Sequence, residues 1–331
     1  MLYMSDRFKS LQNWLRETLQ TNNFILKPAS EDASFRYYYR LTINNDTFIV
    51  MDAPPHHEDS KSFVRVNNIL HECNINVPII HNMDLKQGFL LLSDFGDDHY
   101  LNKLTAFSAN NLYSDAIQTI LSMQLSGDTR GLDIYNEVLL RHEISLFTDW
   151  LLNKHLDITL STHQINAIDN LFDLLVTNAL EQPQVFVHRD FHSRNLMMMP
   201  DNNPGVIDFQ DAIIGPITYD LVSLLKDCYI KWSKKEINNW VDLYCKQLAM
   251  HDGKLKIDRG QFQRWFDLMG VQRHLKACGI FARLFHRDNK HQFLKDIPRT
   301  LSYIVDLSHT YKELLPLCDL IEDSIFPELE K

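Results

Sequence analysis

Three oxygen-bearing side chains in one short segment could together carry out phosphoryl transfer. Asp190 follows the apolar run at 185–187, Asn195 comes five residues later, and Asp208 follows a second apolar run. Phosphoryl transfer needs a base that aligns the attacking hydroxyl and oxygen ligands for magnesium. Magnesium needs only one or two protein carboxylates, because phosphate and water oxygens complete its shell. The segment therefore predicts Asp190 as the base and Asn195 and Asp208 as ligands of Mg²⁺.

The same segment admits two interpretations that involve no phosphoryl transfer. Asp and Asn are ordinary turn residues, so an acidic loop can arise without any catalytic role. His188, Asp190 and His192 alternate along the chain and could instead bind the metal of a hydrolase, although no comparable His-rich segment follows. The apolar runs at 185–187 and 206–207 resemble the strands of a hairpin, which would hold the loop and favours phosphoryl transfer.

The N-terminal part of the chain predicts a sheet and helices that could carry a nucleotide. Alternating residues at 37–43, a turn at 44–46 and a returning strand at 47–52 indicate a hairpin. An amphipathic helix is expected to begin near Ser5 or Asp6. A second helix is expected from about residue 59 to 73, and a buried strand at 88–92.

Two places in this part could contact a nucleotide. Ser34, Arg36 and Arg40 surround the turn that enters the hairpin, where a hydroxyl and cations could bind phosphate oxygens. Ordinary β pairing explains the same alternation of aromatic residues and arginines. The segment Asp94, Phe95 and Gly96 follows the buried strand and is suited to a hinge that contacts adenine.

From residue 98 onward the pattern becomes mostly helical, which predicts an N-terminal lobe at 1–97 and a C-terminal lobe at 98–331. Ser161 and Gln164 form a capping-box pattern, and so do Ser233 and Glu236. Glu143 could contact a sugar or an amine, but a solvated carboxylate is the favoured interpretation. The basic residues of a later helix could form a phosphate- or sugar-facing surface, but a solvated helix face is the favoured interpretation; they are Arg273, His274, Lys276, Arg283, His286 and Arg287.

Composition limits the classes of ligand. The chain has 331 residues, enough for two lobes. Its net charge of −10 argues against general nucleic-acid binding and favours a small ligand. The five cysteines are scattered, without a CxxC pair, which is typical of a reducing compartment. With no signal-peptide pattern and no long apolar run, we expect a cytoplasmic protein with no membrane association and no obligate protein partner.

Several segments together resemble the aminoglycoside-phosphotransferase-related kinases of the protein-kinase-like superfamily. His188, Arg189 and Asp190 match the HRD of the pattern HRDxxxxN, and Asp208 begins a DFQ sequence in place of DFG. Within that group the chain is most similar to the anomeric N-acetylmuramate/N-acetylglucosamine kinases of bacterial peptidoglycan recycling. The segments are ASFRYYYR, FIVMDAPP, FLLLSDFGD, VHRDFHSRNLM, GVIDFQDAIIGPITYDLVSLLKDCYI and GIFARLFHRD.

The resemblance implies an α+β, bilobal protein-kinase-like fold, with an antiparallel sheet in the small N-terminal lobe and a mostly helical C-terminal lobe. It implies transfer of the γ-phosphoryl group of ATP to the C1 hydroxyl of an amino sugar. His188 and Arg189 would brace the loop, and residues 94–96 would form the adenine hinge. The residues near enough in sequence to contact the sugar substituents are His192, Arg194, Gln210 and Asp211.

One departure from the kinase pattern leaves alternatives open. The strand that usually carries a phosphate-binding lysine has Met51 and Asp52 instead, so Arg36 or Arg40 would have to replace that lysine. Another acceptor, such as an aminoglycoside, choline or homoserine, is one alternative, with Asp211 and Glu143 as an acidic pocket. A non-catalytic kinase-like binding protein is the other.

Overall fold

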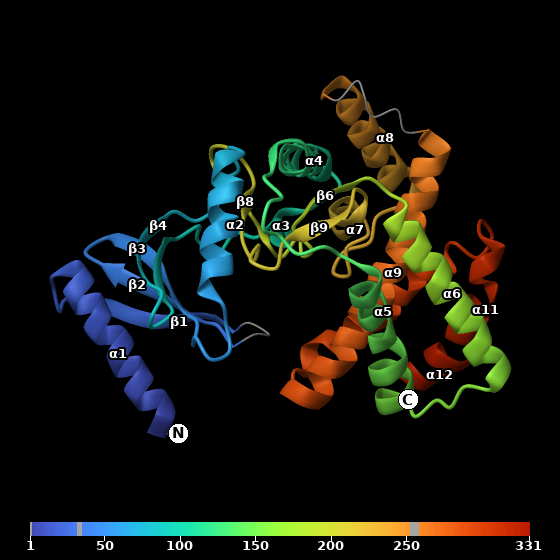
Figure 1. Cartoon of the computed structure of the whole chain (residues 1–331), viewed down its shortest axis with the longest axis horizontal. Helices are drawn as coiled ribbons and strands as arrows, with labels where there is room; N and C mark the ends of the chain where they lie inside the picture. Colours follow the sequence, from blue (N-terminus) through green and yellow to red (C-terminus); the bar gives the residue numbers. More distant parts are fainter. Residues whose placement is uncertain (1, 32–34, 252–257) are drawn as a thin grey trace.

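The computed structural model describes residues 2–31, 35–251 and 258–331 and divides into a sheet-containing part and a mostly helical part (Figure 1). Strand β5 (Phe89–Ser93) is the last strand of the N-terminal sheet, and helix α3 (Tyr100–Lys103) is the first helix after it. This division confirms the expected α+β, two-lobed architecture. No helix in the described ranges is both long and apolar enough to span a membrane.

The N-terminal sheet has five antiparallel strands in the order β1-β2-β3-β5-β4. The predicted hairpin is confirmed as β2 paired with β3, and its turn contains Asn44 at φ 55°, a left-handed conformation that Asn tolerates. The predicted buried strand is confirmed as β5. The other strands are β1 (Ile25–Glu31), β2 (Tyr37–Ile43), β3 (Asp46–Asp52) and β4 (Ile80–Asp84).

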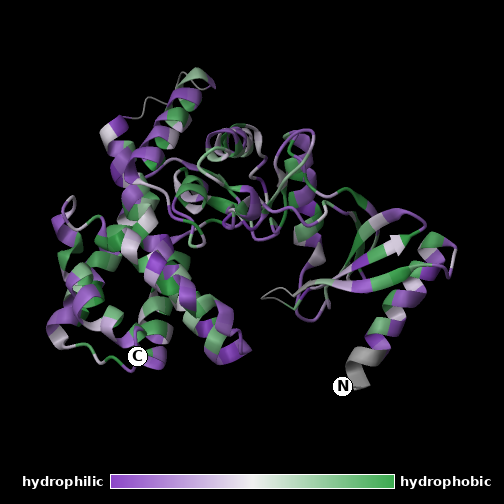
Figure 2. Cartoon of the chain, turned by 180° about the vertical axis from the view of Figure 1, so that it is seen from behind, coloured by the Kyte–Doolittle hydropathy of each residue, from purple (hydrophilic) through white to green (hydrophobic). Residues whose placement is uncertain are grey.

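Helix α1 (Leu2–Leu19) covers one face of this sheet. Leu11, Trp14 and Leu15 are buried in a small core with residues of β2, β3 and β5. Figure 2 shows hydrophilic and hydrophobic bands alternating along this helix, as one buried side requires. The expected start near Ser5 or Asp6 is wrong, because the helix is already formed at Leu2 and the Asp6 carboxylate bonds Lys9 Nζ rather than a backbone N–H.

An ion pair between Arg7 of α1 and Asp52 of β3 attaches the helix to the sheet. Arg7 also donates a hydrogen bond of 2.8 Å to the Gln87 carbonyl. Asp52 is, with Met51, one of the two residues predicted to stand where kinases carry a lysine, and here its carboxylate stabilises the lobe through this ion pair.

Helix α2 (Ser60–Glu72) buries one side, which includes Phe63 and Val66, in the larger hydrophobic core. The Asp59 carboxylate accepts from Lys61 N at 2.9 Å, which caps the helix. This confirms the helix expected from about residue 59. Phe63 also contacts Phe209, with ring centroids 4.8 Å apart, so α2 contacts the segment that carries Asp208.

The helical part is built around α9 (Arg259–Asp288), which packs against helices from several directions (Figure 1). Both predicted capping boxes form, at Ser161 before α6 and at Ser233 before α8. The helices between α3 and α9 are α4 (Ala109–Ser126), α5 (Glu137–Leu146) with its π-helical continuation η1 (Phe147–His155), α6 (Thr162–Leu180), α7 (Tyr219–Leu225) and α8 (Lys234–His251). The short C-terminal elements are η2 (His291–Asp296), α10 (Ile297–Val305), η3 (Lys312–Leu314), α11 (Leu315–Leu320), η4 (Ile321–Ile325) and α12 (Phe326–Leu329).

Two small ladders hold the segment from 184 to 216. β6 (Gln184–Val187) pairs with β9 (Ile213–Pro216), and β7 (Leu196–Met197) pairs with β8 (Gly205–Val206). The hairpin expected between the runs at 185–187 and 206–207 is therefore wrong. The chain turns back on itself after Asn195, so Val206 pairs with Leu196 and leaves β6 to pair with β9.

Close backbone contact between α5 and α9 leads to a stability prediction at Gly279. A Cβ at this position would overlap the Leu146 carbonyl and lie 2.6 Å from Phe147 N. We expect Gly279→Ala to lower the free energy of unfolding by about 1–3 kcal/mol, because neither backbone can move aside easily. Urea unfolding followed by circular dichroism measures this change. The exposed Gly260→Ala variant in the first turn of α9 is the control, and an equal effect at both positions would contradict the prediction.

Candidate active site

The loop from His188 to Asn195 is held in place by two acidic side chains that follow it in sequence. Asp220 of α7 accepts hydrogen bonds from His188 N at 2.7 Å and Arg189 N at 3.0 Å. Arg189 has φ 77°, an unusual conformation for a large residue, and these two bonds stabilise it. Burial raises the pKa of Asp220 to about 7, while its two backbone N–H donors oppose that rise.

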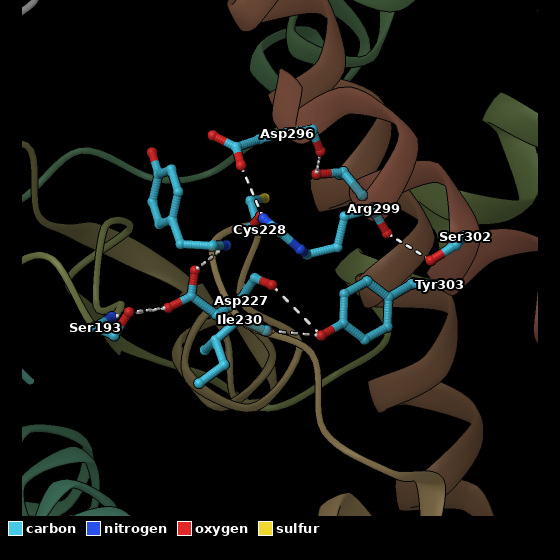
Figure 3. Close-up of polar contacts among 10 residues, drawn as sticks. Ser193, Asp227, Cys228, Ile230, Asp296, Arg299, Ser302 and Tyr303 are labelled. Carbon is cyan, nitrogen blue, oxygen red and sulfur yellow. Dashed lines mark hydrogen bonds and ion pairs between the residues drawn. The ribbon is translucent and has the colours of Figure 1, made fainter. Parts of the chain in front are cut away.

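Asp227 holds the other half of the loop (Figure 3). Its carboxylate accepts from Ser193 N at 3.0 Å and also from the Ser193 hydroxyl, and it accepts from Tyr229 N at 2.9 Å. The Tyr303 hydroxyl of α10 donates to the Ile230 carbonyl at 3.0 Å beside this group. The loop is thus attached through Asp227 to the C-terminal helices.

Asp190, Asn195 and Asp208 meet at one place. The Asn195 side-chain amide donates to the Asp190 carbonyl at 3.0 Å and to Asp208 Oδ2 at 3.1 Å. Gln210 Nε2 donates to Asp208 Oδ1 at 2.8 Å. Asp208 itself has φ 63°, in the left-handed region. The residues that the sequence predicts as base and metal ligands are therefore neighbours in space.

All three of these side chains line a cavity of about 1020 Å³ between the two parts of the molecule. One side of the cavity is formed by the sheet and the segment after β5, including Ile49, Leu92 and Phe95. The opposite side is formed by α5 and α9. Asp190 lines the same cavity as residues of both lobes. A side chain in this position could act between two molecules, one bound by each lobe.

The charge on Asp190 is set by its surroundings. Burial acts to raise its pKa, but the positive charges of Lys276, Arg189 and Arg273 help to lower it overall. The carboxylate is therefore ionised at neutral pH. His188 beside it stays neutral, because burial lowers its pKa to about 4, and its Nδ1 accepts from Asp190 N at 3.2 Å.

Glu143 of α5 is buried, so the favoured interpretation as a solvated carboxylate is wrong. It accepts hydrogen bonds from Tyr135 and Arg189 and pairs with Lys276 Nζ at 3.1 Å. Burial would raise its pKa, but these cations lower it overall. The packing of α5 against α9 encloses the group, and its effect is to fix the Arg189 side chain next to Asp190.

Part of the basic set on α9 also differs from the favoured interpretation, whereas His286 and Arg287 are exposed as it predicts. Arg273, His274 and Lys276 are each less than 10% exposed, because the helix is covered on several sides. Arg273, Lys276 and Arg283 line the cavity. Arg273 and Lys276 approach Asp190 from a segment distant in sequence, which the helical pattern alone does not predict.

Arg40 and Asp94, both predicted to contact the nucleotide, form an ion pair with each other. Arg40 Nε lies 2.7 Å from Asp94 Oδ2, and Arg40 Nη2 lies 2.8 Å from Asp97 Oδ1. Arg36 pairs with Glu58, at 2.7 Å. Gly96 N donates to Asp94 Oδ1 at 2.9 Å, and Phe95 and Gly96 line the same cavity. Ser34 lies outside the described residues.

The residues considered for sugar contacts occupy different positions. His192 packs edge-on against Tyr229, and Arg194 stacks 3.7 Å above that ring. Gln210 is buried against Asp208, whereas Asp211 is exposed, and Glu143 is enclosed on α5. Asp211 and Glu143, suggested as an acidic pocket, both line the cavity, but the charge of Glu143 is paired with Arg189 and Lys276.

The alternative of a metal triad receives no support. Within residues 2–31, 35–251 and 258–331, no three His, Cys, Asp or Glu side chains gather where they could hold a metal ion. The rings of His188 and His192 pack against Phe191 and Tyr229 respectively.

Asp220 and Asp227 were not identified from the sequence as components of the site, and Arg273 and Lys276 were considered only within a basic surface for which a solvated helix face was favoured. One signal was present for the first two, since both acids lie in the largely apolar segment at 212–230. A carboxylate in a buried segment needs hydrogen-bond donors, and here the donors are the backbone groups of the loop.

Comparisons with known proteins agree with this geometry. The model of the "Phosphotransferase enzyme family" matches residues 25–256. The N-acetylmuramate/N-acetylglucosamine kinase of Pseudomonas aeruginosa is 41% identical, over 96% of this chain and 97% of that protein. The protein of the same name from Neisseria meningitidis serogroup B is 37% identical, over 96% of each chain.

Solved structures share the fold at low sequence identity. The choline kinase of Cryptosporidium parvum superposes with a TM-score of 0.63 at 12% identity, covering 94% of this chain and 98% of that one. The aminoglycoside phosphotransferase APH(2″)-IIa in complex with gentamicin gives a TM-score of 0.62 at 15% identity, covering 92% and 97%. The two-lobed arrangement is therefore the protein-kinase-like fold.

Proposed function

Because the chain belongs to the phosphotransferase enzyme family and is a phosphotransferase with a hydroxyl acceptor, we propose that it transfers the γ-phosphoryl group of ATP to the anomeric C1 hydroxyl of N-acetylmuramate or N-acetylglucosamine. One observation carries this proposal: Asp190, Asn195 and Asp208 meet at a single cavity, in a chain 41% identical to a kinase named for these sugars. Products of this kind belong to peptidoglycan recycling.

In this proposal Asp190 orients the C1 hydroxyl and accepts its proton. A bond forms between the sugar oxygen and the γ-phosphorus, and the bond from that phosphorus to the bridging oxygen breaks, releasing ADP. An anomeric hydroxyl is more acidic than an ordinary alcohol, so positioning and charge neutralisation carry most of the rate. His188 and Arg189 hold the loop, and the cations Arg273 and Lys276 lie beside the reacting groups.

Asn195 and Asp208 are suited to hold Mg²⁺. Asn195 turns its amide nitrogen toward Asp190 and Asp208, which leaves its carbonyl oxygen for an ion, and Asp208 contributes a carboxylate. Such a hard-oxygen donor pair fits magnesium, which takes its remaining ligands from phosphate and water. The ion would supply charge neutralisation for the phosphates.

The lobe at 1–97 is proposed to bind the nucleotide. Since the Asp94 side chain is engaged by Arg40, adenine would contact the backbone of 94–96 rather than this carboxylate. Phe95 packs closely against Gly205 of β8, which attaches the hinge to the C-terminal lobe. A cytoplasmic location is part of the proposal, because ATP and the free sugar must both reach the enzyme.

We propose Arg36 as the replacement for the missing phosphate-binding lysine. Both arginines line the cavity, but Arg40 forms ion pairs with two carboxylates, those of Asp94 and Asp97. Arg36 forms an ion pair with the carboxylate of Glu58. Arg36→Ala should raise the KM for ATP by about tenfold, the loss expected for one charged hydrogen bond. Steady-state kinetics at saturating sugar measure it, with the exposed Lys27→Ala as control. An unchanged KM in both Arg36→Ala and Arg40→Ala would remove both arginines from the phosphate site.

Lys276 should set the acid limb of the pH profile. It is the largest of the charges that lower the pKa of Asp190, so Lys276→Gln should raise that pKa and move the acid limb of kcat/KM to higher pH. Lys276→Arg, which keeps the charge, should leave the limb near its wild-type position. A profile of unchanged shape in Lys276→Gln would show that Asp190 does not control this limb.

Phosphorus NMR of the product tests the proposed function directly. Incubation with ATP, Mg²⁺ and either sugar should give the signal of a C1 phosphate coupled to the anomeric proton. Choline, homoserine and an aminoglycoside serve as competing acceptors. Phosphorylation of one of these, with neither sugar modified, would refute the proposal, and so would the absence of any acceptor-dependent ATP consumption.

A further inference from the structure

One side of α9 forms a wall of the cavity, and its cations are not equivalent. Arg273, Lys276, Ile280 and Arg283 follow one another at helical spacing along that wall. Lys276 is neutralised, because it pairs with Glu143 at 3.1 Å and donates to the Tyr219 hydroxyl at 3.0 Å. Arg273 lies at the end near Asp190, whose charge it influences. Arg283 lies at the other end.

Arg283 makes no ion pair or hydrogen bond with another residue of the described chain. Its Nε is buried without a partner. The nearby carboxylate of Asp288 is engaged by Arg287 at 2.9 Å. Burial and the charge of Arg287 lower the pKa of Arg283. A partly buried guanidinium without an ion-pair partner has lost part of its hydration and has no protein anion to replace it. At a cavity wall it is therefore suited to bind an anionic group of a ligand, which would supply charged hydrogen bonds.

The two candidate sugars differ by a single anionic group. N-acetylmuramate carries a lactyl ether with a carboxylate on C3, and N-acetylglucosamine carries a hydroxyl there. Building on the proposed function, we propose that Arg283 binds the lactyl carboxylate of N-acetylmuramate when the C1 hydroxyl lies at Asp190. Arg283 is thus a specificity-determining residue that favours the anionic sugar.

The dimensions of the wall fit this orientation. Arg273 and Arg283 are ten residues apart on one helix, about 15 Å along its axis. Side chains on a helix lean toward its N-terminus, so Arg283 extends toward Lys276 and the reacting end. A sugar with its lactyl group covers the remaining distance. Leu284 and Phe293 line the same region, and apolar surroundings strengthen a guanidinium–carboxylate pair.

The test compares both sugars in Arg283→Gln. The ratio of kcat/KM for N-acetylmuramate to that for N-acetylglucosamine should fall by about 10- to 100-fold, as expected for loss of a charged hydrogen-bonded pair. Arg283→Lys should restore part of the ratio. The control is Lys295→Gln, which removes an exposed charge of η2 that does not line the cavity and should leave the ratio unchanged.

A second measurement needs no variant. The methyl ester of N-acetylmuramate keeps the shape of the lactyl group without its charge, so the wild-type enzyme should use it less well than the free acid by a similar factor. Equal use of ester and acid, or an unchanged ratio in Arg283→Gln, would overturn the assignment while the proposed function stands. Failure of the wild type to phosphorylate either sugar would instead refute the proposed function.

Discussion

Asp190→Asn should lower kcat by about 10²- to 10⁴-fold, the usual contribution of a positioned base. The substitution keeps the shape of the side chain and removes its capacity to accept the proton of the C1 hydroxyl. The loop should stay in place, because Asp220 and Asp227 hold its backbone without the Asp190 carboxylate. The KM for ATP should therefore change little.

Steady-state kinetics with each sugar, together with a thermal unfolding curve, separate catalysis from folding in this variant. Asp169→Asn on the exposed side of α6 is a control for loss of one carboxylate away from the cavity. Turnover of Asp190→Asn equal to that of the wild type would end the assignment of Asp190 as the base.

Asp208→Asn should reduce kcat/KM for ATP by about 10²- to 10³-fold, the cost of removing one preorganised electrostatic group. Asp208 has φ 63°, and asparagine tolerates this left-handed conformation as well as aspartate does. The backbone should therefore be preserved, and the loss should come from the charge that Mg²⁺ would bind.

A magnesium titration of activity gives the specific readout for Asp208. The concentration of Mg²⁺ at half-maximal rate should rise in Asp208→Asn, and calorimetry should show weaker magnesium-dependent binding of ADP. Gln210→Ala, which removes only the amide that donates to Asp208 at 2.8 Å, should have a smaller effect. An Asp208→Asn enzyme with the wild-type magnesium requirement would exclude this residue as a ligand.

Local signals in the sequence predicted the elements well. The β2–β3 hairpin, the helix that starts after Asp59 and the capping box at Ser161 each depend on residues close together in the chain, and all three are present. The partner of β6 was predicted wrongly because strand pairing depends on the path of the intervening chain, which composition does not reveal.

Within the site, too, contacts between residues close in sequence could be predicted, and contacts between distant segments could not. Asp190, Asn195 and Asp208 lie in one segment, so their proximity could be predicted from the sequence. Arg273 and Lys276 come from α9, whose charged residues favoured the interpretation of a solvated helix face. That interpretation failed for these two residues because other helices pack around α9 and bury them, and the sequence of α9 does not reveal this packing. Arg40 and Asp94 were each considered for nucleotide contacts, and their mutual ion pair could not be predicted from either segment alone.

The anchoring of the loop from His188 to Asn195 by Asp220 and Asp227 has a consequence for the entropy of the proposed reaction. Hydrogen bonds from His188, Arg189 and Ser193 restrict the loop backbone through contacts that involve neither substrate. Little conformational freedom is then left for the sugar or the nucleotide to remove on arrival, so their binding energy can be directed to aligning the reacting oxygen with phosphorus.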